Sequence, residues 1–280
     1  GGEGIFSFGV NAIITNSGII DAGDEGIHAV SANAIINNSG HITSTTSDGI
    51  ESTGDDAIIT NSGTITAGDT GINSTGDDAI ITNSGSITAG NDGILLLGAN
   101  NAAVTNSGTI TAADIGIFSN SANATITNSG TITSTGDEGD GIQSFGVNAI
   151  ITNSGTITAG DIGMYSNGVN AIINNSGHIT STTSDGIVSL GANATINNSG
   201  HITGTNYAVL GWTNDNLTLN LLKGSQLMGK IDLGGVGAVD NDTVNIHGGS
   251  VSATLTLLNT ENVNLLGPGL KLSGDVVVSV

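Results

Sequence analysis

Short segments in which apolar and polar residues alternate follow one another along most of the chain. Residues 148–161 read Asn-Ala-Ile-Ile-Thr-Asn-Ser-Gly-Thr-Ile-Thr-Ala-Gly-Asp, and most similar stretches continue to a Gly-Ile pair. Segments of four to six residues with a period of two predict β-strands, and the Gly, Asn, Asp and Ser between them predict turns. The β-branched Ile and Thr, together with 45 Gly in 280 residues, disfavour helix.

The tripeptide Asn-Ser-Gly recurs nine times at intervals of 22 to 25 residues. Each interval holds three short strands, so equivalent strands of successive repeats can pair along a common axis. The repeat therefore predicts an all-β parallel β-helix with three strands per coil of 22–23 residues. Residues 33–50 and 170–187 are identical, which indicates growth by duplication. The nine copies begin at Asn16, Asn38, Asn61, Asn83, Asn106, Asn128, Asn153, Asn175 and Asn198.

Alternation also predicts which side chains point into the helix. The repeated Asn is expected to form a ladder of stacked amides, and the Gly of Asn-Ser-Gly to supply the positive φ of a tight corner. Both roles are structural, which argues against a catalytic meaning for the invariant tripeptide. The expected inward columns are Ala12, Ala34, Ala57, Ile14, Ile36 and Ile59 in the first strand, Ile20 through Ile202 in the second, and Ile5, Ile27 and Ile50 with their successors Met164 and Tyr207 in the third.

The pattern changes after residue 211. Asn-Ser-Gly disappears, Leu replaces Ile, and all three Lys of the chain lie beyond this point. Alternation continues in residues 217–221, 242–246 and 255–257. We therefore divide the chain into regular coils over residues 1–211 and less regular coils of the same helix over residues 212–280, and expect the chain to be a piece of a longer protein.

Charge and composition exclude several kinds of partner. The chain has 24 acidic residues, three Lys and no Arg, which give a net charge of −21. Nucleic acids and anionic membranes attract cationic proteins, so neither is expected to bind. The chain has no Cys, which excludes disulfides, thiolate metal sites and a Cys nucleophile.

The repeat and the late part of the chain resemble the passenger domains of bacterial autotransporters (type V secretion). Two features carry the resemblance: the motif Asn-x-Gly-x-Ile followed six residues later by Gly-Ile, and the stretch over residues 222–246 that contains Gly-Ser-Gln-Leu-Met-Gly-Lys-Ile. The resemblance covers essentially the whole chain. It implies a right-handed β-helix at the bacterial outer-membrane surface or secreted from it, held to the membrane only through a C-terminal barrel that this sequence lacks.

The outward positions of the third strand are the main candidates for function. Two columns flank the inward Ser of this strand and hold all four Phe of the chain. An exposed apolar strip of this kind marks a contact surface, is covered by another segment, or is tolerated. Polar residues in the same two columns, from Glu51 to Thr75, interrupt this apolar strip. Ala208 and Leu210 are expected to end it. The candidate partner-binding residues are Phe6, Phe8, Leu95, Leu97, Phe118, Phe145, Tyr165, Val188 and Leu190.

An acidic residue lies one or two positions before the Gly of each Gly-Ile corner over eight coils. Stacked carboxylates repel one another unless cations bridge them, and calcium prefers oxygen ligands in loose geometry. The alternative is that each Asp caps its own turn by accepting hydrogen bonds from backbone N–H groups. The candidate calcium ligands are Asp24, Asp48, Asp69, Asp92, Asp114, Asp140, Asp161 and Asp185.

Other chemistry is weakly supported. His41, His178 and His201 occupy equivalent outward positions, but a stacked His pair without a third ligand is a poor zinc site. The paired acids of residues 55–56 and 77–78 lie on a convex corner, and no coil has an insertion of more than three residues that could build a catalytic cleft. An outward Thr-x-Thr array resembles ice-binding solenoids, with Thr also common on any exposed strand.

We therefore expect no enzymatic activity and no cofactor other than calcium. The passenger is expected to act as an adhesin that binds a host-cell surface protein or glycan, or that associates with itself. A β-helical carbohydrate-active enzyme and an ice-binding solenoid are the alternatives.

Overall fold

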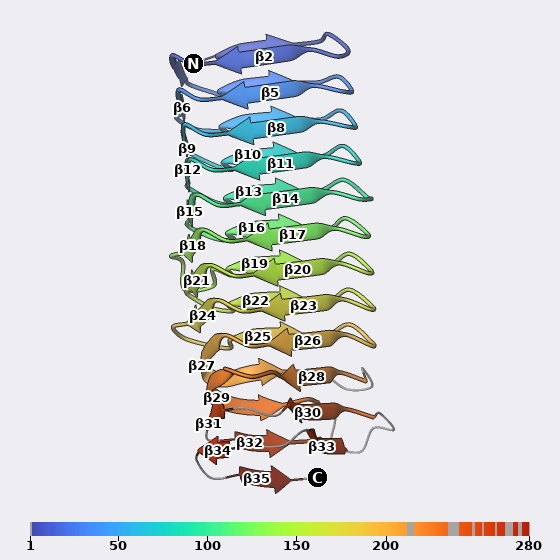
Figure 1. Ribbon diagram of the computed structural model, residues 1–280. Coiled ribbons are helices and arrows are strands. Elements are labelled where there is room, and N and C mark those ends of the chain that lie inside the picture. The colour runs from blue at the N-terminus through green and yellow to red at the C-terminus, as the bar shows by residue number, and fades with distance from the viewer. Residues whose placement is uncertain are drawn as a thin grey trace.

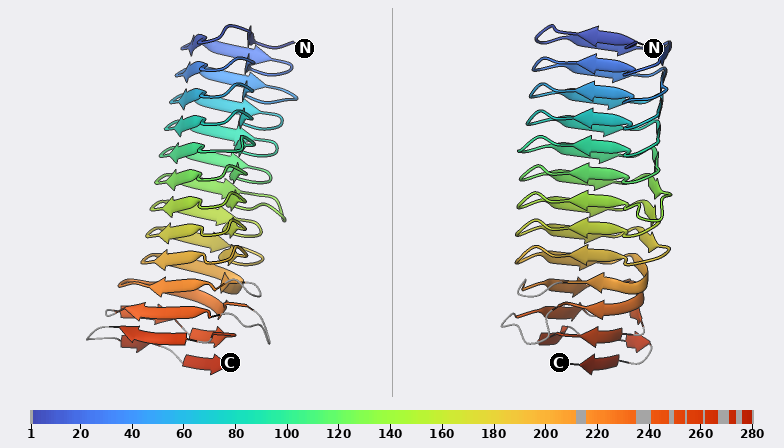
Figure 2. Two further views of the ribbon diagram at one scale, coloured as in Figure 1. Left: turned by 90° about the vertical axis from the view of Figure 1, so that its right-hand side faces the viewer. Right: turned by 180° about the vertical axis from the view of Figure 1, so that it is seen from behind.

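The chain forms a β-solenoid in which each coil contributes three short strands (Figures 1 and 2). The computed structural model describes residues 2–211, 216–234, 241–247, 250–253, 255–260, 262–266, 271–273 and 276–279. All strand pairs in this part of the chain are parallel, and the described residues contain no helix. The structure confirms the predicted parallel β-helix and its repeat length.

Strands from equivalent positions of successive coils stack into three faces along the rod. The first face is a 12-stranded sheet in which each strand pairs with the strands one coil before and after it. Its strands are β2 (Ile13–Asn16), β5 (Ile35–Asn38), β8 (Ile58–Asn61), β11 (Ile80–Asn83), β14 (Ala103–Asn106), β17 (Thr125–Asn128), β20 (Ile150–Asn153), β23 (Ile172–Asn175), β26 (Thr195–Asn198), β28 (Thr218–Leu221), β30 (Thr243–His247) and β33 (Asn262–Leu266).

The second face follows the Asn-Ser-Gly corner. Its strands are β3 (Ile19–Ala22), β6 (His41–Ser44), β9 (Thr64–Ala67), β12 (Ser86–Ala89), β15 (Thr109–Ala112), β18 (Thr131–Ser134), β21 (Thr156–Ala159) and β24 (His178–Ser181). The third face carries the predicted contact residues. Its strands are β1 (Ile5–Ser7), β4 (Ile27–Ala29), β7 (Ile50–Ser52), β10 (Ile72–Ser74), β13 (Ile94–Leu96), β16 (Ile117–Ser119), β19 (Ile142–Ser144), β22 (Met164–Ser166) and β25 (Ile187–Ser189).

Later strands extend both of these faces. The long strand β27 (His201–Leu210) pairs with β24 and β25 and so joins the second face to the third. Strand β29 (Gln226–Asp232) pairs with β27 along both of its parts. Beyond it lie β31 (Ser250–Ala253), β32 (Leu255–Leu258), β34 (Lys271–Ser273) and β35 (Val276–Ser279). The stacking therefore continues past residue 211 in the described part of the chain.

The core consists of the predicted inward columns. Ile36, Ile59, Ile65 and Ile72 are fully buried, and Met164 occupies the third-strand column as expected. Each buried Ile contributes roughly 1.5–3 kcal/mol through removal of apolar area from water. Stacking like residues on like residues fills the interior without any large aromatic side chain.

The Asn of each Asn-Ser-Gly forms the predicted ladder. Its Nδ2 donates to the Oδ1 of the equivalent Asn one coil later at 2.8–2.9 Å, from Asn16 through to Asn198. The ladder satisfies buried amides that would otherwise each cost about 1–3 kcal/mol.

The expectation for the Gly of this tripeptide was wrong. Among the described glycines only Gly224, Gly229 and Gly234 have positive φ. A Cβ on Gly85 would instead lie 2.0 Å from the carbonyl oxygen of Gly63 in the previous coil. Glycine is required at this corner because the coils approach each other closely. The left-handed position belongs to the Asn or Asp before the first strand: Asn11, Asn33, Asp56, Asp78, Asn101, Asn123, Asn148, Asn170, Asn193 and Asn216.

Candidate functional site

The third face presents two outward columns in the predicted register. Strand pairing aligns Leu95 with Phe118, Gln143 with Tyr165, and Tyr165 with Val188. Residues of the second column follow each strand, and their N–H groups donate to the preceding coil, as from Phe145 to the Ser119 carbonyl. The two columns run side by side along the rod, separated by the inward residue between them.

Three aromatic rings meet on this face, and we call them the aromatic patch: Phe118, Phe145 and Tyr165. The ring centroid of Phe145 lies 5.5 Å from that of Phe118 and 5.4 Å from that of Tyr165. The rings alternate between the two columns because Phe145 belongs to the second column and its neighbours to the first. Phe145 is 36% exposed, and the other two rings are half-buried. Such a row of tilted rings offers an apolar surface of several side chains.

The aliphatic candidates extend the patch unevenly. Leu97 is 46% exposed, whereas Leu95 and Leu190 are half-buried. Val188 is only 4% exposed, and it lies between its register partners Tyr165 and Leu210. Its small side chain is covered by these larger neighbours, so Val188 does not offer the accessible contact that the sequence suggested.

The end of the strip differs from the prediction. Val209, and not Tyr207, pairs with Ile187 and fills the inward column. Ala208 takes the place of the Gly before it and is fully buried, so Ala208 is not an outward residue. The prediction failed because this coil has no Gly-Ile pair to mark the register.

Phe6 and Phe8 form a separate group at the N-terminal end of the same face. Their ring centroids lie 4.1 Å apart in an edge-to-face arrangement, and Phe6 also lies 4.8 Å from the His28 ring. Phe8 is 71% exposed. The polar side chains of Glu51 and Asn73 separate this group from the aromatic patch, as predicted.

The eight predicted calcium ligands fall into two columns. Directly before the Gly, the Asp side chain is buried, and its Oδ1 accepts the N–H of the equivalent residue one coil later. Asp92 accepts from Ile115 at 3.1 Å and Asp140 from Ile162 at 2.8 Å. The buried column holds Asp48, Asp92, Asp140 and Asp185, and the more exposed position before it holds Asp24, Asp69, Asp114 and Asp161.

Burial perturbs the first of these columns. It raises the pKa of Asp92 and of Asp140 to about 6, with smaller opposing effects from their hydrogen bonds. Burial also raises the pKa of Asp48 and Asp185. These carboxylates accept backbone N–H groups, which is the turn-capping role that we considered alongside calcium. Within the described residues, none of the eight belongs to a group of three or more potential ligands whose atoms lie within 4.8 Å.

The paired acids of the opposite corner also cap turns. Asp55 accepts the N–H of Asp77, and Asp77 accepts the N–H groups of Ala99 and Asn100. Hydrogen bonding from Asn100 lowers the pKa of Asp77. A general acid needs the opposite shift, so this pair does not resemble the acid of a glycosidase.

Two features escaped the sequence analysis. One is an apolar column on the first face, where Ile13 is 71% and Ile80 is 47% exposed. It borders a groove formed with the left-handed corner and lined by Asn11, Ile13, Asn33, Ile35, Asp56, Ile58, Asp78 and Ile80. The signal was present, because the first Ile of each Ala-Ile-Ile stretch must point outward if the second points inward.

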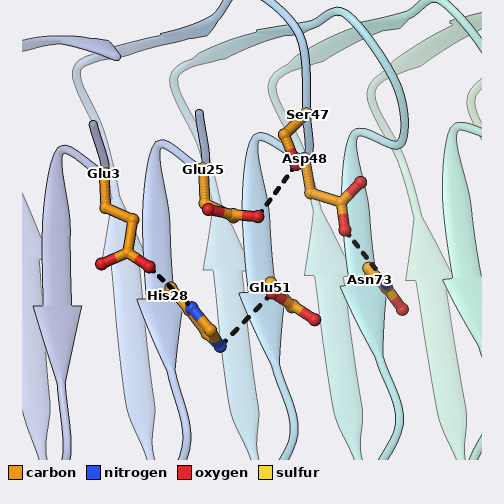
Figure 3. Close-up of polar contacts among 7 residues, drawn as sticks. All are labelled: Glu3, Glu25, His28, Ser47, Asp48, Glu51 and Asn73. Atoms are coloured by element: carbon orange, nitrogen blue, oxygen red, sulfur yellow. Dashed lines mark hydrogen bonds and ion pairs between the residues drawn. The ribbon is translucent and has the colours of Figure 1, made fainter. Parts of the chain in front are cut away.

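The other missed feature is a group of ionisable side chains at the N-terminal end, formed by Glu3, Glu25, His28 and Glu51 (Figure 3). Glu25 is half-buried and lies directly before Gly26, at the position that the buried Asp residues occupy in other coils. Glu3 holds the same position before Gly4.

Comparison with protein-family models, with curated proteins and with solved structures gives no match to this chain. In the described part of the chain, we find no helix long and apolar enough to cross a membrane.

Proposed function

We propose that this protein is a non-enzymatic binding module, the β-helical passenger of an autotransporter-like bacterial surface or secreted protein. The aromatic patch is its contact surface, and the module acts as an adhesin. The observation that carries the proposal is the row of three aromatic rings joined by two ring contacts on one outward face, with Phe145 and the neighbouring Leu97 exposed. Apolar surface gathered in this way is most often a recognition surface.

The remaining outward chemistry supports binding over catalysis. The four buried Asp side chains whose pKa is raised accept hydrogen bonds from the backbone of the next coil. They thereby stabilise turns, and they do not converge on a cleft. The repeat motif and the late Gly-Ser-x-Leu-x-Gly-x-Ile stretch support the passenger assignment.

A row of neighbouring aromatic rings suits two kinds of partner. The rings can cover the apolar faces of sugars or the side chains of a host-cell surface protein, and they can equally pack against a second copy of the same patch. The acidic surface of the rod disfavours polyanionic glycans. The test must therefore separate heterologous binding from self-association.

Replacing the patch tests the proposal. The test variant combines Phe118→Ser, Phe145→Ser and Tyr165→Ser. If the patch binds a host partner, this variant should lose binding to host cells and glycan arrays. If the patch binds a second copy of the chain, the variant should lose the dimer that analytical ultracentrifugation detects in the parent. Each single change should cost about 1 kcal/mol of stability or less, because these rings are outside the core. Ile117→Ala, one residue before the outward column, should cost roughly 2–5 kcal/mol by opening a cavity.

The matched control replaces Asn73 and Thr75, which occupy the same two columns on a polar coil, with Ala. This variant should bind and associate as the unmodified protein does. A triple Ser variant that folds and still shows every activity of the parent would overturn the aromatic patch as the contact surface.

A further inference from the structure

The cluster at the N-terminal end combines a histidine with three carboxylates, from two equivalent positions in three successive coils. Glu3 and Glu25 lie directly before Gly4 and Gly26 in successive coils, and His28 and Glu51 are register partners on the third face. One carboxylate oxygen of Glu3, one of Glu25 and a ring nitrogen of His28 all lie within 4.8 Å of one another. Figure 3 shows His28 between the carboxylates of Glu3 and Glu51, with Glu25 beside them and turned toward Ser47.

The imidazole of His28 has a carboxylate against each of its nitrogens. Its Nδ1 lies 3.3 Å from Glu3 Oε1, and its Nε2 lies 3.3 Å from Glu51 Oε2. A neutral imidazole carries one N–H, so one nitrogen faces a carboxylate with a lone pair. The Nδ1 contact with Glu3 has hydrogen-bond geometry. When the N–H is on Nε2 instead, Nδ1 and the Glu3 carboxylate are two electron donors that a shared cation would join.

The distances suit a small divalent ion. In a tetrahedral site with bonds of about 2.0–2.1 Å, neighbouring ligand atoms lie about 3.3 Å apart. This is the separation between His28 Nδ1 and Glu3 Oε1. A shift of the Glu25 side chain would bring its oxygen to the same separation.

Supporting contacts surround the three ligands. Glu51 would orient the ring through Nε2, as carboxylates do behind metal-bound histidines. Ser47 Oγ donates to Glu25 Oε1 at 2.9 Å and supports that carboxylate from the next coil. The three Lys of the chain all follow residue 222 and so lie toward the opposite end of the rod (Figure 1), and they cannot neutralise this cluster.

We propose that Glu3, Glu25 and His28 bind one divalent transition-metal ion of zinc-like preference, with Glu51 as the positioning residue. One nitrogen and two carboxylate ligands leave a fourth position for water or for a group of a partner. The proposal is independent of the aromatic patch.

The test is a titration of the full chain, stripped with EDTA, with zinc chloride at pH 7.5 by isothermal calorimetry. We expect one ion per chain. His28→Asn, which installs the residue found at the equivalent position 73, and Glu25→Gln should each weaken binding at least about tenfold. Glu51→Gln should weaken it by about 10–100-fold through loss of the charge behind the ring. Equal melting temperatures of the variants in EDTA establish that they fold.

The control is His178→Thr. His178 stacks on His201 with ring centroids 4.4 Å apart, and this pair is another place where zinc could find imidazole. This variant should bind zinc as the parent does. The proposal is overturned if His28→Asn leaves zinc binding unchanged, if His178→Thr removes it, or if millimolar calcium displaces zinc, since calcium would require oxygen ligands alone.

Discussion

A single residue position decides what each acidic side chain does at the Gly-Ile corner. An Asp directly before the Gly is buried, and its carboxylate accepts a hydrogen bond from a backbone N–H of the next coil, as Asp92 does from Ile115. One residue earlier, Asp69 and Asp24 remain exposed. Burial disfavours the charged form and raises the pKa of the Asp residues in the first group. Two chemically identical side chains thus differ through placement alone.

The buried Asp column makes stability depend on pH in an unusual direction. The pKa of Asp92 and Asp140 is raised to about 6 from 3.8, so the folded state binds more protons than the unfolded state between these values. Their contribution to stability is present below pH about 4 and is lost as the pH rises through 6. We expect the melting temperature to fall from pH 4.5 to pH 7.

Replacement by Asn isolates this effect. Asp92→Asn with Asp140→Asn keeps an acceptor for the Ile115 and Ile162 N–H groups and removes the titration, so the fall between pH 4.5 and 7 should become shallower. Asp24→Asn with Asp69→Asn changes net charge equally at exposed positions and should leave the fall in place. Identical pH profiles for the two double variants would contradict the assignment.

At the scale of the strand, the sequence predicted which side chains point inward. Side chains alternate with a period of two, so aligning the Ile columns leaves only one possible set of inward residues. The same logic failed at β27, where the Gly-Ile pair is absent and Val209 took the place expected for Tyr207. The role of Gly85 and its equivalents was also missed. Close approach between coils depends on backbone coordinates, which residue preferences do not contain.

Functional placement was harder to predict than the strands. The aromatic patch followed from alternation, since Phe118 and Tyr165 come directly after inward residues. The burial of Val188 did not, because it depends on the size of its neighbours one coil away. The cluster of Glu3, Glu25 and His28 could not be predicted for the same reason. Glu3 and Glu25 are 22 residues apart in the sequence, and their proximity follows only from the register between coils.

The Asn ladder makes each first-face strand depend on its neighbours. Asn106→Ala would remove the bonds to Asn83 and Asn128, so that Asn83 Nδ2 keeps only its long contacts with the Gly85 and Thr109 carbonyls. We expect a loss of roughly 2–5 kcal/mol in chemical denaturation, because a lost or weakened bond to a buried amide costs about 1–3 kcal/mol. The comparison is Asn123→Gly, which removes exposed amide bonds at a position with φ of 57° that Gly tolerates. Equal losses in both variants would show that ladder burial is unimportant.

At the scale of the whole molecule, stacking and charge oppose each other. Identical coils place like side chains above one another, which favours packing of the Ile columns and brings acidic residues together at the corners. The chain carries a net charge of −21, and its three Lys all lie beyond residue 222. Long-range repulsion within the rod is therefore large at low ionic strength, and salt should reduce it.

This balance supplies the test of calcium binding by the acidic corners. Turn capping predicts that sodium chloride raises the melting temperature and that calcium and magnesium act alike at matched ionic strength, because both only screen the charge. A calcium site predicts an additional rise by mass action, with much less from magnesium, which requires stricter octahedral geometry. Since Asp48, Asp92, Asp140 and Asp185 already accept backbone N–H groups, we expect no calcium-specific shift. Thermal melts in millimolar calcium and magnesium decide between the two, and a calcium-specific rise that disappears when these four residues become Asn would assign the ion to the ladder.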